Sequence, residues 1–355
     1  MEIKSELKYT RKSQIGVGEG LNSTVYLVDE PQLGGQMVVK EMPKSRFGGD
    51  ASIFFREAQA MFASSAPNVV PIQYASQTPA GHLPELVCIC MPYFKNGSLA
   101  KRIEVNPLSL KEFIRVGQGI LLGLGTIHAK KLLHFDIKPT NIFFNNNDEP
   151  LVADFGQACT FGITGTAIPA AIYQPAMPPE MIGTYTGNVQ SDIYQVGLTL
   201  YRAANGEPVY QQQVPQDVPT WEQRTLRGKF PDRDLFLPHV PQSIRKVIRK
   251  ALRTTPSDRY GSAAEMADAI SRIQIRNDWI IASTAMEATW TSHRDQRPDL
   301  IVKQKKAGSG WNIELYTQQS GSKLRAKDIA KWKSGQSLKD SNDYLKTLFA
   351  DLESA

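Results

Sequence analysis

The most informative segment of this chain is HFDIKPTN, residues 134–141. It brings together an aspartate, a lysine two residues later and an asparagine three residues further on, namely Asp136, Lys138 and Asn141. These residue types fit one loop that handles a hydroxyl group, a phosphate and a metal ion. A second carboxylate, Asp154, stands directly before Phe-Gly and supplies a further oxygen ligand for the same metal. The segment therefore predicts a phosphate-transfer site.

The order and spacing of these residues resemble the catalytic and metal-binding loops of protein kinases. The resemblance implies that Asp136 accepts or orients the proton of the attacking hydroxyl group and that Lys138 stabilises charge on the transferring phosphoryl group. It also implies that Asn141 and Asp154 bind Mg²⁺ at the phosphates of ATP. One residue departs from the pattern, because Phe135 stands where most protein kinases carry arginine.

An earlier segment extends the resemblance to the nucleotide phosphates. Residues 18–25, GEGLNSTV, are similar to the kinase glycine-rich loop, with Gly18, Gly20 and Val25 at the family positions. Ser23 takes the place of the third glycine. Small residues matter in such a loop because bulky side chains would keep backbone N–H groups away from phosphate oxygens.

A second segment, MVVK at residues 37–40, resembles the strand that carries the nucleotide-binding lysine. The resemblance implies that Lys40 binds the α- and β-phosphates and that Glu57, on a helix expected over residues 52–62, is its ion-pair partner. Val38 replaces the usual alanine and would narrow the space above the adenine. Taken alone, Lys40 would be an ordinary edge-strand lysine.

Residues 91–99 look like the hinge between the two lobes of a kinase. In this interpretation Met91 is the gatekeeper, the carbonyl of Pro92 and the N–H of Phe94 contact the adenine, and Phe143 completes the nucleotide site. Proline is tolerated at position 92 because only its carbonyl is needed. A simple strand end followed by a turn is consistent with the same residues.

Three later residues favour a protein kinase over a small-molecule kinase. Glu180 lies in Pro-Pro-Glu, which resembles the Ala-Pro-Glu signature, and Arg259 stands where the family places the arginine that pairs with this glutamate. Asp192 resembles the helix-start aspartate that braces the catalytic loop. Lys138, two residues after Asp136, favours serine or threonine over tyrosine as the acceptor.

The sequence also departs from the family around the substrate. Without an arginine at Phe135, we expect activity that does not require phosphorylation of the loop after Asp154. Counting back from Glu180 puts Tyr173 where the family has threonine, so the substrate-facing loop is expected to be remodelled. Cys159 lies in this loop and is expected to be packed rather than reactive.

Composition bounds the class of protein. The chain has 355 residues, of which 41% are hydrophobic and 21% charged, and its net charge is +6, a balance typical of a globular enzyme for anionic nucleotides. Three cysteines without a Cys-x-x-Cys pair argue against disulfides and structural zinc. The N-terminus is not signal-like, and the apolar run 119–127 is too short to span a bilayer, so a soluble, cytoplasmic protein is expected.

The predicted fold class is α+β, with a bilobal protein-kinase fold and a small C-terminal α+β domain. We expect the β-rich N-lobe and hinge over residues 1–94, the helical C-lobe over 95–275 and the additional domain over 276–355. Residues 69–92 should hold two strands, the second of them apolar on both faces and therefore buried on both sides. In the last domain, residues 299–317 should form a β-hairpin, and Leu345, Leu348 and Leu352 have helical spacing.

The residues after 275 belong to no family that the sequence identifies. They carry 13 lysines and arginines against 10 acidic residues, with basic residues clustered around Trp332. A nucleic-acid or acidic-partner surface and a solvated face with Trp332 in the core are both consistent with this cluster, and the solvated face is favoured. A protein partner is the expected role of this region.

The leading hypothesis is therefore an ATP- and Mg²⁺-dependent protein kinase that phosphorylates serine or threonine in a protein substrate. A pseudokinase scaffold is the alternative from another class, and it is disfavoured because the catalytic residues are all present. A small-molecule kinase is the third hypothesis, and Glu180, Asp192 and Arg259 argue against it.

Overall fold

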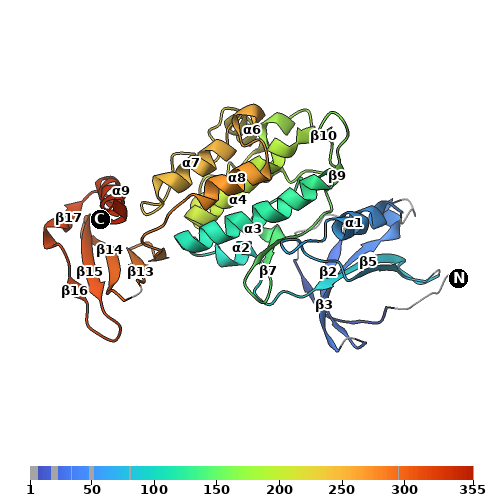
Figure 1. Cartoon of the computed structure of the whole chain (residues 1–355), viewed down its shortest axis with the longest axis horizontal. Coiled ribbons are helices and arrows are strands. Elements are labelled where there is room, and N and C mark those ends of the chain that lie inside the picture. The colour runs from blue at the N-terminus through green and yellow to red at the C-terminus, as the bar shows by residue number, and fades with distance from the viewer. Residues whose placement is uncertain are drawn as a thin grey trace.

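The computed structural model describes residues 7–16, 23–32, 34–47, 52–79, 81–294 and 296–354. An N-terminal sheet, a helical middle and a C-terminal sheet with one helix follow one another along the longest axis of the molecule (Figure 1). Among the helices that the structure describes, none combines the length and apolar character needed to cross a bilayer.

The N-terminal part is an antiparallel sheet of strand order β1-β2-β3-β5-β4, accompanied by α1 (Ser52–Ala63). Its strands are β1 (Thr10–Ile15), β2 (Thr24–Glu30), β3 (Gly35–Pro43), β4 (Tyr74–Gln77) and β5 (Leu86–Pro92). In β5, Cys88 and Cys90 pack into one apolar cluster, while Val87 and Ile89 pack into the main core. The prediction that this strand is buried on both faces is confirmed.

The middle part is mainly helical and is built around α3 (Leu110–Ala129) and α4 (Val189–Asn205). Its other helices are α2 (Leu99–Arg102), α5 (Glu207–Gln211), α6 (Val218–Leu226), α7 (Gln242–Ala251) and α8 (Ala263–Ser271). Gly119 and Gly123 on α3 leave no room for a Cβ atom, which would collide with Pro150 and with the carbonyl of Asn68. These two glycines, four residues apart, therefore let α3 pack closely against its neighbours as a buried helix.

Short strands connect this helical part to the loops that carry the polar motifs. They are β6 (Leu132–Leu133), β7 (Ile142–Phe144), β8 (Pro150–Val152), β9 (Cys159–Thr160), β10 (Thr166–Ala167) and β11 (Gly187–Asn188). They pair antiparallel as β6 with β9, β7 with β8 and β10 with β11. Each pairing fixes a loop on the side of α3 and α4 that faces the N-terminal sheet (Figure 1).

The C-terminal part is an antiparallel sheet of order β12-β13-β14-β15-β16, with β17 also paired to β15 and α9 (Leu338–Ser354) packed against it. The strands are β12 (Trp279–Ser283), β13 (Glu287–Ser292), β14 (Asp299–Ala307), β15 (Gly310–Gln318), β16 (Arg325–Ala326) and β17 (Lys333–Gln336). The predicted hairpin is confirmed as β14–β15, and the predicted terminal helix buries Leu345, Leu348 and Leu352.

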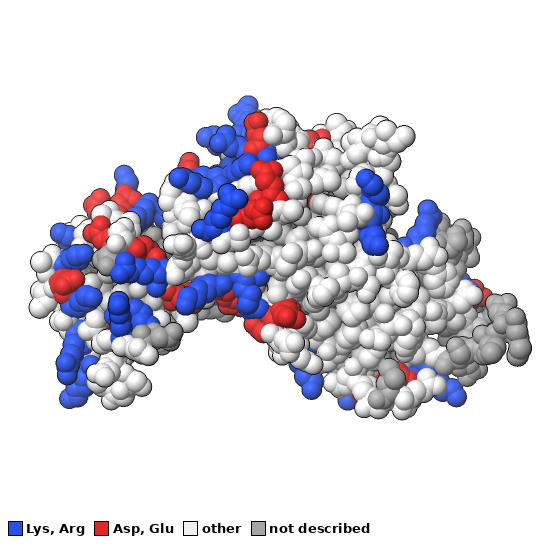
Figure 2. All heavy atoms as spheres, in the orientation of Figure 1, with Lys and Arg blue, Asp and Glu red and all other residues white. Residues whose placement is uncertain are grey.

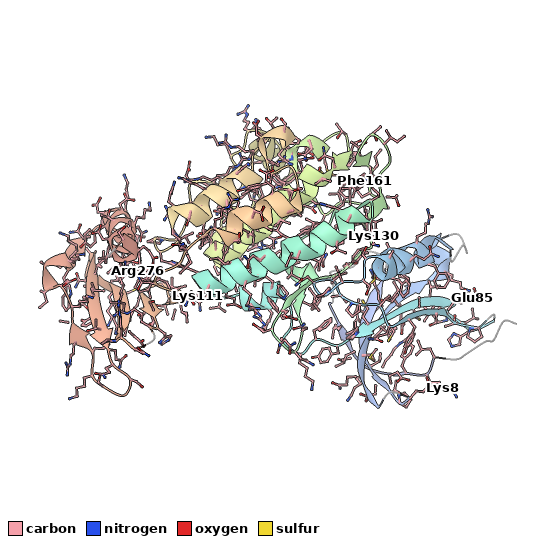
Figure 3. The ribbon with its side chains drawn as sticks, viewed as in Figure 1. Lys8, Glu85, Lys111, Lys130, Phe161 and Arg276 are labelled. Carbon is pink, nitrogen blue, oxygen red and sulfur yellow. The ribbon has the colours of Figure 1, made fainter. Side chains whose placement is uncertain are left out.

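This C-terminal part packs on the end of the helical part that lies away from the N-terminal sheet. The indole N–H of Trp290 donates to Nδ1 of His239 at 3.0 Å, and the Phe349 ring packs against both of these rings. Asp278 accepts hydrogen bonds from Ser109 and from the backbone N–H of Lys111, at the N-terminus of α3. In Figure 3, the labels of Lys111 and Lys130 mark the two ends of this helix, with Lys111 toward the C-terminal part.

Candidate active site

The HFDIKPTN segment forms a loop that is held in place by α4. Asp192 is fully buried, and its carboxylate accepts the backbone N–H of His134 at 2.9 Å and that of Phe135 at 2.8 Å. One turn along the helix, Gln195 accepts the N–H of Ile137 at 3.0 Å and donates to the carbonyl of Phe135 at 2.9 Å. The sequence correctly assigns Asp192 to bracing this loop.

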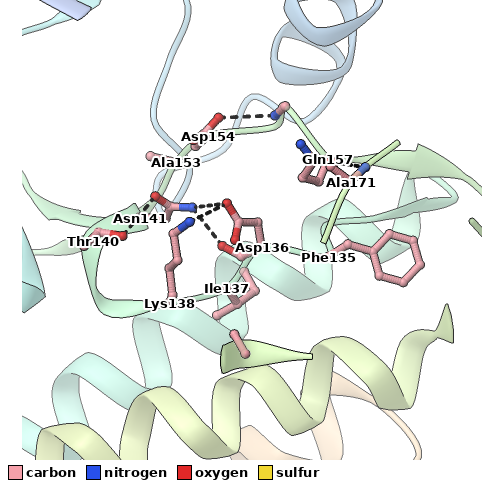
Figure 4. Close-up of polar contacts among 12 residues, drawn as sticks. Phe135, Asp136, Ile137, Lys138, Thr140, Asn141, Ala153, Asp154, Gln157 and Ala171 are labelled. Carbon is pink, nitrogen blue, oxygen red and sulfur yellow. Dashed lines mark hydrogen bonds and ion pairs between the residues drawn. The ribbon is translucent and has the colours of Figure 1, made fainter. Parts of the chain in front are cut away.

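The loop presents a carboxylate with one oxygen held by hydrogen bonds and one oxygen without a partner among the described residues. Oδ2 of Asp136 lies 2.9 Å from the ammonium of Lys138 and accepts the side-chain N–H of Asn141 at 2.9 Å (Figure 4). Oδ1 is buried and has no hydrogen-bond partner among the described residues. Burial raises the pKa of Asp136, although the charge of Lys138 acts in the opposite direction. The arrangement leaves a basic oxygen available to a hydroxyl group.

A second carboxylate faces Lys40 of β3. The Lys40 ammonium lies 2.9 Å from Oδ1 of Asp154, which also accepts the N–H of Gly156 at 3.3 Å. Burial alone would raise the pKa of Asp154, but the Lys40 charge and hydrogen bond outweigh it and lower this pKa to about 2. Asp154 is therefore ionised at neutral pH, as a ligand for a cation must be.

The residue after Asp154 explains why that carboxylate faces the cleft. Phe155 is 1% exposed, and its ring packs 5.1 Å, centroid to centroid, from the ring of His134. His134 in turn contacts the carbonyl of Ala153 through Nε2 at 3.1 Å. Asp154 has a left-handed backbone with φ of +64°, so the chain turns between the buried phenylalanine and the open carboxylate.

The cleft between the N-terminal sheet and the helical part has a volume of about 1380 Å³. Lys40, Asp136, Lys138 and Asp154 all line it, so four of the predicted site residues share one cavity. Tyr173 also lines the cavity, and its ring centroid lies 4.7 Å from the Lys138 ammonium.

The nucleotide-site residues that were predicted from the hinge lie on neighbouring strands. Val38 of β3 pairs with Met91 of β5, next to Pro92 at the end of that strand. The rings of Phe94 and Phe143 lie 6.3 Å apart, and Val25 of β2 pairs with Lys40. Two predicted residues, Gly18 and Gly20, lie outside the described residues, as does the side chain of Glu57, whose backbone belongs to α1.

An ion pair stiffens the helical part below the cleft. Arg259 has no exposed side-chain surface and contacts both carboxylate oxygens of Glu180, at 2.8 and 2.6 Å. Ser191 of α4 donates a further hydrogen bond to Glu180 at 2.8 Å. The sequence correctly pairs Glu180 with Arg259, and the fork geometry is the one in which arginine binds carboxylates best.

Three residues that support the HFDIKPTN loop were missed at the level of sequence. Gln195 and Thr199 of α4 both bond the catalytic loop, the hydroxyl of Thr199 donating to the carbonyl of Ile137 at 3.3 Å. His128 of α3 places Nε2 at 2.8 Å from Asp192. The available signal was the spacing of Asp192, Gln195 and Thr199, which puts three polar residues on one face of an otherwise apolar helix.

A family model and several curated relatives all relate this chain to protein kinases. Residues 9–270 match the family model described as "Protein kinase domain". Serine/threonine-protein kinase PknK of Mycobacterium tuberculosis is 27% identical over 297 residues, which cover 83% of this chain and 26% of PknK. PrkC of Bacillus subtilis is 27% identical over 258 residues (70% of this chain, 38% of PrkC). PknB of Mycolicibacterium smegmatis is 28% identical over 267 residues (72% and 42%). The chain thus spans less than half the length of each of these curated relatives.

Proposed function

Because the chain belongs to the protein kinase family, we propose that it transfers the γ-phosphoryl group of ATP to a serine or threonine hydroxyl group of a protein substrate. The observation that carries the proposal is the carboxylate of Asp136, which lines the cleft, with Oδ2 held by Lys138 and Asn141 and Oδ1 without a hydrogen-bond partner among the described residues. The three relatives are all named serine/threonine-protein kinases, which supports the choice of acceptor.

In the proposed reaction, the acceptor hydroxyl group donates its hydrogen bond to Oδ1 of Asp136. The oxygen attacks the γ-phosphorus, the bond from that phosphorus to the β-γ bridging oxygen breaks, and ADP leaves with the electron pair. Asp136 orients the hydroxyl group and takes its proton, for which a raised pKa suits it. Lys138, beside Asp136, contributes positive charge where the transferring group becomes more negative.

The donor set of the cleft fits Mg²⁺. Asp154 is an ionised carboxylate, and the amide nitrogen of Asn141 is occupied by Asp136. The amide oxygen of Asn141 accepts a long hydrogen bond of 3.4 Å from Thr140 and is the group of this side chain that can bind a metal. We infer that Asn141 and Asp154 hold Mg²⁺ and that Lys40 holds the α- and β-phosphates. When bound, Mg²⁺ neutralises the phosphate charge and orients the phosphates.

The test is phosphate transfer from labelled ATP to a general protein acceptor in the presence of Mg²⁺. We expect Asp136→Asn to lower kcat by at least about a hundredfold, because Oδ1 loses its basicity. Asp234→Asn is the matched control, since it removes the same charge from a side chain that is 87% exposed and outside the cleft. Equal transfer by the wild type and Asp136→Asn would contradict the mechanism and would leave the pseudokinase scaffold as the better hypothesis.

We also propose that activity does not depend on phosphorylation of the loop after Asp154. Phe135 is 1% exposed and packs against Gly187, so this position offers no cation to a phosphate. Uncharged contacts hold the loop instead, including the β6–β9 and β10–β11 pairings and the hydrogen bond from the Ala171 N–H to Gln157 at 2.7 Å.

For the C-terminal part, we propose a protein partner rather than nucleic acid. Basic side chains are spread over this part with acidic ones between them (Figure 2). The ring of Tyr316 already contacts Trp332, at 5.2 Å, and Lys303, at 5.9 Å, within the chain, and base stacking would compete with these contacts. A gel shift of the full chain with single-stranded RNA or DNA that weakens with salt would contradict this proposal.

A further inference from the structure

The loop that faces the substrate carries no charge. Residues 156–179, which we call the substrate-facing loop, contain no aspartate, glutamate, lysine, arginine or histidine, although 21% of the whole chain is charged. Its large exposed side chains are instead apolar or aromatic: Ile163 is fully exposed, Ile168 is 63% exposed and Tyr173 is 49% exposed. The small polar side chains of Thr160 and Thr164 are exposed as well. Ile168 and Tyr173, unlike Ile163, also line the catalytic cavity, and an exposed apolar surface at such a place usually marks a binding site.

Part of this loop forms a wall of the catalytic cavity. We call one stretch of these lining residues the wall, and its members are small or apolar: Ala167, Ile168, Ala170, Ala171, Ile172 and Tyr173. The loop also lines the cavity with the uncharged polar side chains of Gln157, Thr160 and Gln174. The other cations of the cavity that lie outside the catalytic set are Arg56, Lys130 and Arg202, and they come from α1, the end of α3 and α4. Arg202 is paired with Glu207 at 2.8 Å.

The wall is fixed with respect to the rest of the site. The backbone N–H of Ala171 donates to Gln157 at 2.7 Å, and the thiol of Cys159 lies 3.5 Å from the carbonyl of Ile168 (Figure 4 shows the contact between Gln157 and Ala171). Ala167 is paired in register with Gly187 of β11. A surface held in this way can select among substrates without first being ordered by them.

The wall ends beside the catalytic base. The Tyr173 ring lies 4.7 Å from the ammonium of Lys138, which itself lies 2.9 Å from Oδ2 of Asp136. When the hydroxyl group of a substrate reaches Asp136, the substrate side chains next to the acceptor residue must therefore lie near the wall. Apolar side chains gain free energy there by leaving water. A charged side chain would lose hydration, and the wall offers it no opposite charge.

We propose that the protein substrate carries apolar side chains next to the acceptor hydroxyl group and that the substrate-facing loop selects them through Ile168, Ile172 and Tyr173. The inference rests on the proposed kinase function and specifies its substrate class. Two features carry the inference: the substrate-facing loop has no charged residue, and part of this loop lines the catalytic cavity. Neither feature depends on the chemistry at Asp136.

The first experiment uses the full chain, ATP, Mg²⁺ and a set of serine peptides that differ at one neighbour of the serine. Each neighbour is leucine, aspartate or lysine in turn, and kcat/KM is measured for each peptide. We expect leucine to exceed both charged residues by about tenfold or more for at least one adjacent position. Equal values at every position would overturn the inference while leaving the kinase function intact. Transfer to no peptide and to no protein acceptor would instead overturn the proposed function, and this inference with it.

The second experiment ties the preference to the loop. Ile168→Lys places a cation in the wall, while Ile163→Lys places the same cation in the same loop at a residue that does not line the cavity. We expect Ile168→Lys to lower kcat/KM for the leucine peptide and raise it for the aspartate peptide, reducing their ratio by about tenfold. Ile163→Lys should keep both values within about twofold, because its side chain is already solvated. The same change of ratio in both variants would overturn the inference.

Discussion

At the scale of single residues, Phe135 shows how the catalytic loop is kept in an unusual conformation. It has a positive φ of +61°, which non-glycine residues rarely adopt, and its ring is buried. Hydrogen bonds offset the cost of this backbone conformation, because Asp192 accepts the N–H of Phe135 and Gln195 donates to the carbonyl of Phe135. The strain is thus stabilised by α4, which the loop contacts over its whole turn.

This arrangement makes Asp192 a positioning residue with a testable effect. In Asp192→Asn, one of the two charge-assisted bonds to the backbone of His134 and Phe135 must be lost, because an amide nitrogen cannot accept. We expect kcat to fall by about a hundredfold, the effect of misplacing a catalytic group by about 1 Å, with a smaller change in KM. Steady-state kinetics and a thermal melt check this. A variant as active as the wild type, or one whose lost activity equals its unfolded fraction, would contradict the positioning role.

At the scale of elements, the substrate-facing loop, residues 156–179, is held by backbone pairing, and the ion pair of Glu180 with Arg259 follows directly after it. β9 pairs with β6, next to the catalytic loop, and β10 pairs with β11, directly before α4. These bonds form without a phosphate group, because each of them joins backbone N–H and carbonyl groups.

We therefore expect the triple variant Thr160→Ala, Thr164→Ala, Thr166→Ala to keep kcat/KM within about threefold of the wild type, since its pairings use the backbone alone. Gln157→Ala is the informative comparison, because it removes the side chain that receives the Ala171 N–H and should lower activity more than the triple variant does. The measurement is phosphate transfer by protein purified with and without phosphatase treatment. A several-hundred-fold gain on phosphorylation of this loop would refute the expectation.

At the scale of the whole molecule, the junction between the helical part and the C-terminal part contains a buried histidine. His239 is 1% exposed among the rings of Trp290 and Phe349, and Nε2 has no partner among the described residues. Burial, assisted by the charge of Arg245, lowers its pKa to about 3. The folded protein therefore keeps this ring neutral where the unfolded chain would protonate it.

The lowered pKa of His239 makes the folded protein less stable at acidic pH. Between pH 6.5 and about 3, the unfolded chain binds a proton at His239 that the folded chain does not, so the free energy of unfolding falls as the pH drops below 6.5. At pH 5, His239 should lower the free energy of unfolding by about 2 kcal/mol relative to its value at pH 7.5. Thermal melts of the wild type and His239→Gln at both pH values measure the difference, which the variant should lack. Exposed His293→Gln is the control, and identical pH profiles for the wild type and His239→Gln would contradict the prediction.

Sequence reasoning predicted the kinase family, the α+β class and the strand-rich start, because the motifs of residues 134–259 have fixed spacing and the buried strand β5 has a clear apolar pattern. It also found the β14–β15 hairpin and α9 from period and turn residues. The roles of His128 and His239 could not be found, because each depends on which helices and loops pack together and leaves no local pattern in the chain. Gln195 left a partial signal in its spacing from Asp192 and Thr199, but its partner, the backbone of the HFDIKPTN loop, is set by packing.

The length of α3 sets the distance that a partner held by the C-terminal part must cover to reach the cleft. Its N-terminus is capped across the junction by Asp278, and Lys130, just past its C-terminus, lines the catalytic cleft. Its 20 residues make it about 30 Å long. An extended peptide advances about 3.3 Å per residue, so a substrate anchored on the C-terminal sheet needs roughly nine or more residues between its anchor and its acceptor serine or threonine. A protein with fewer residues between its anchor and its serine or threonine would bind the C-terminal sheet without reaching Asp136. It would then inhibit phosphorylation by competing with longer substrates for the C-terminal sheet.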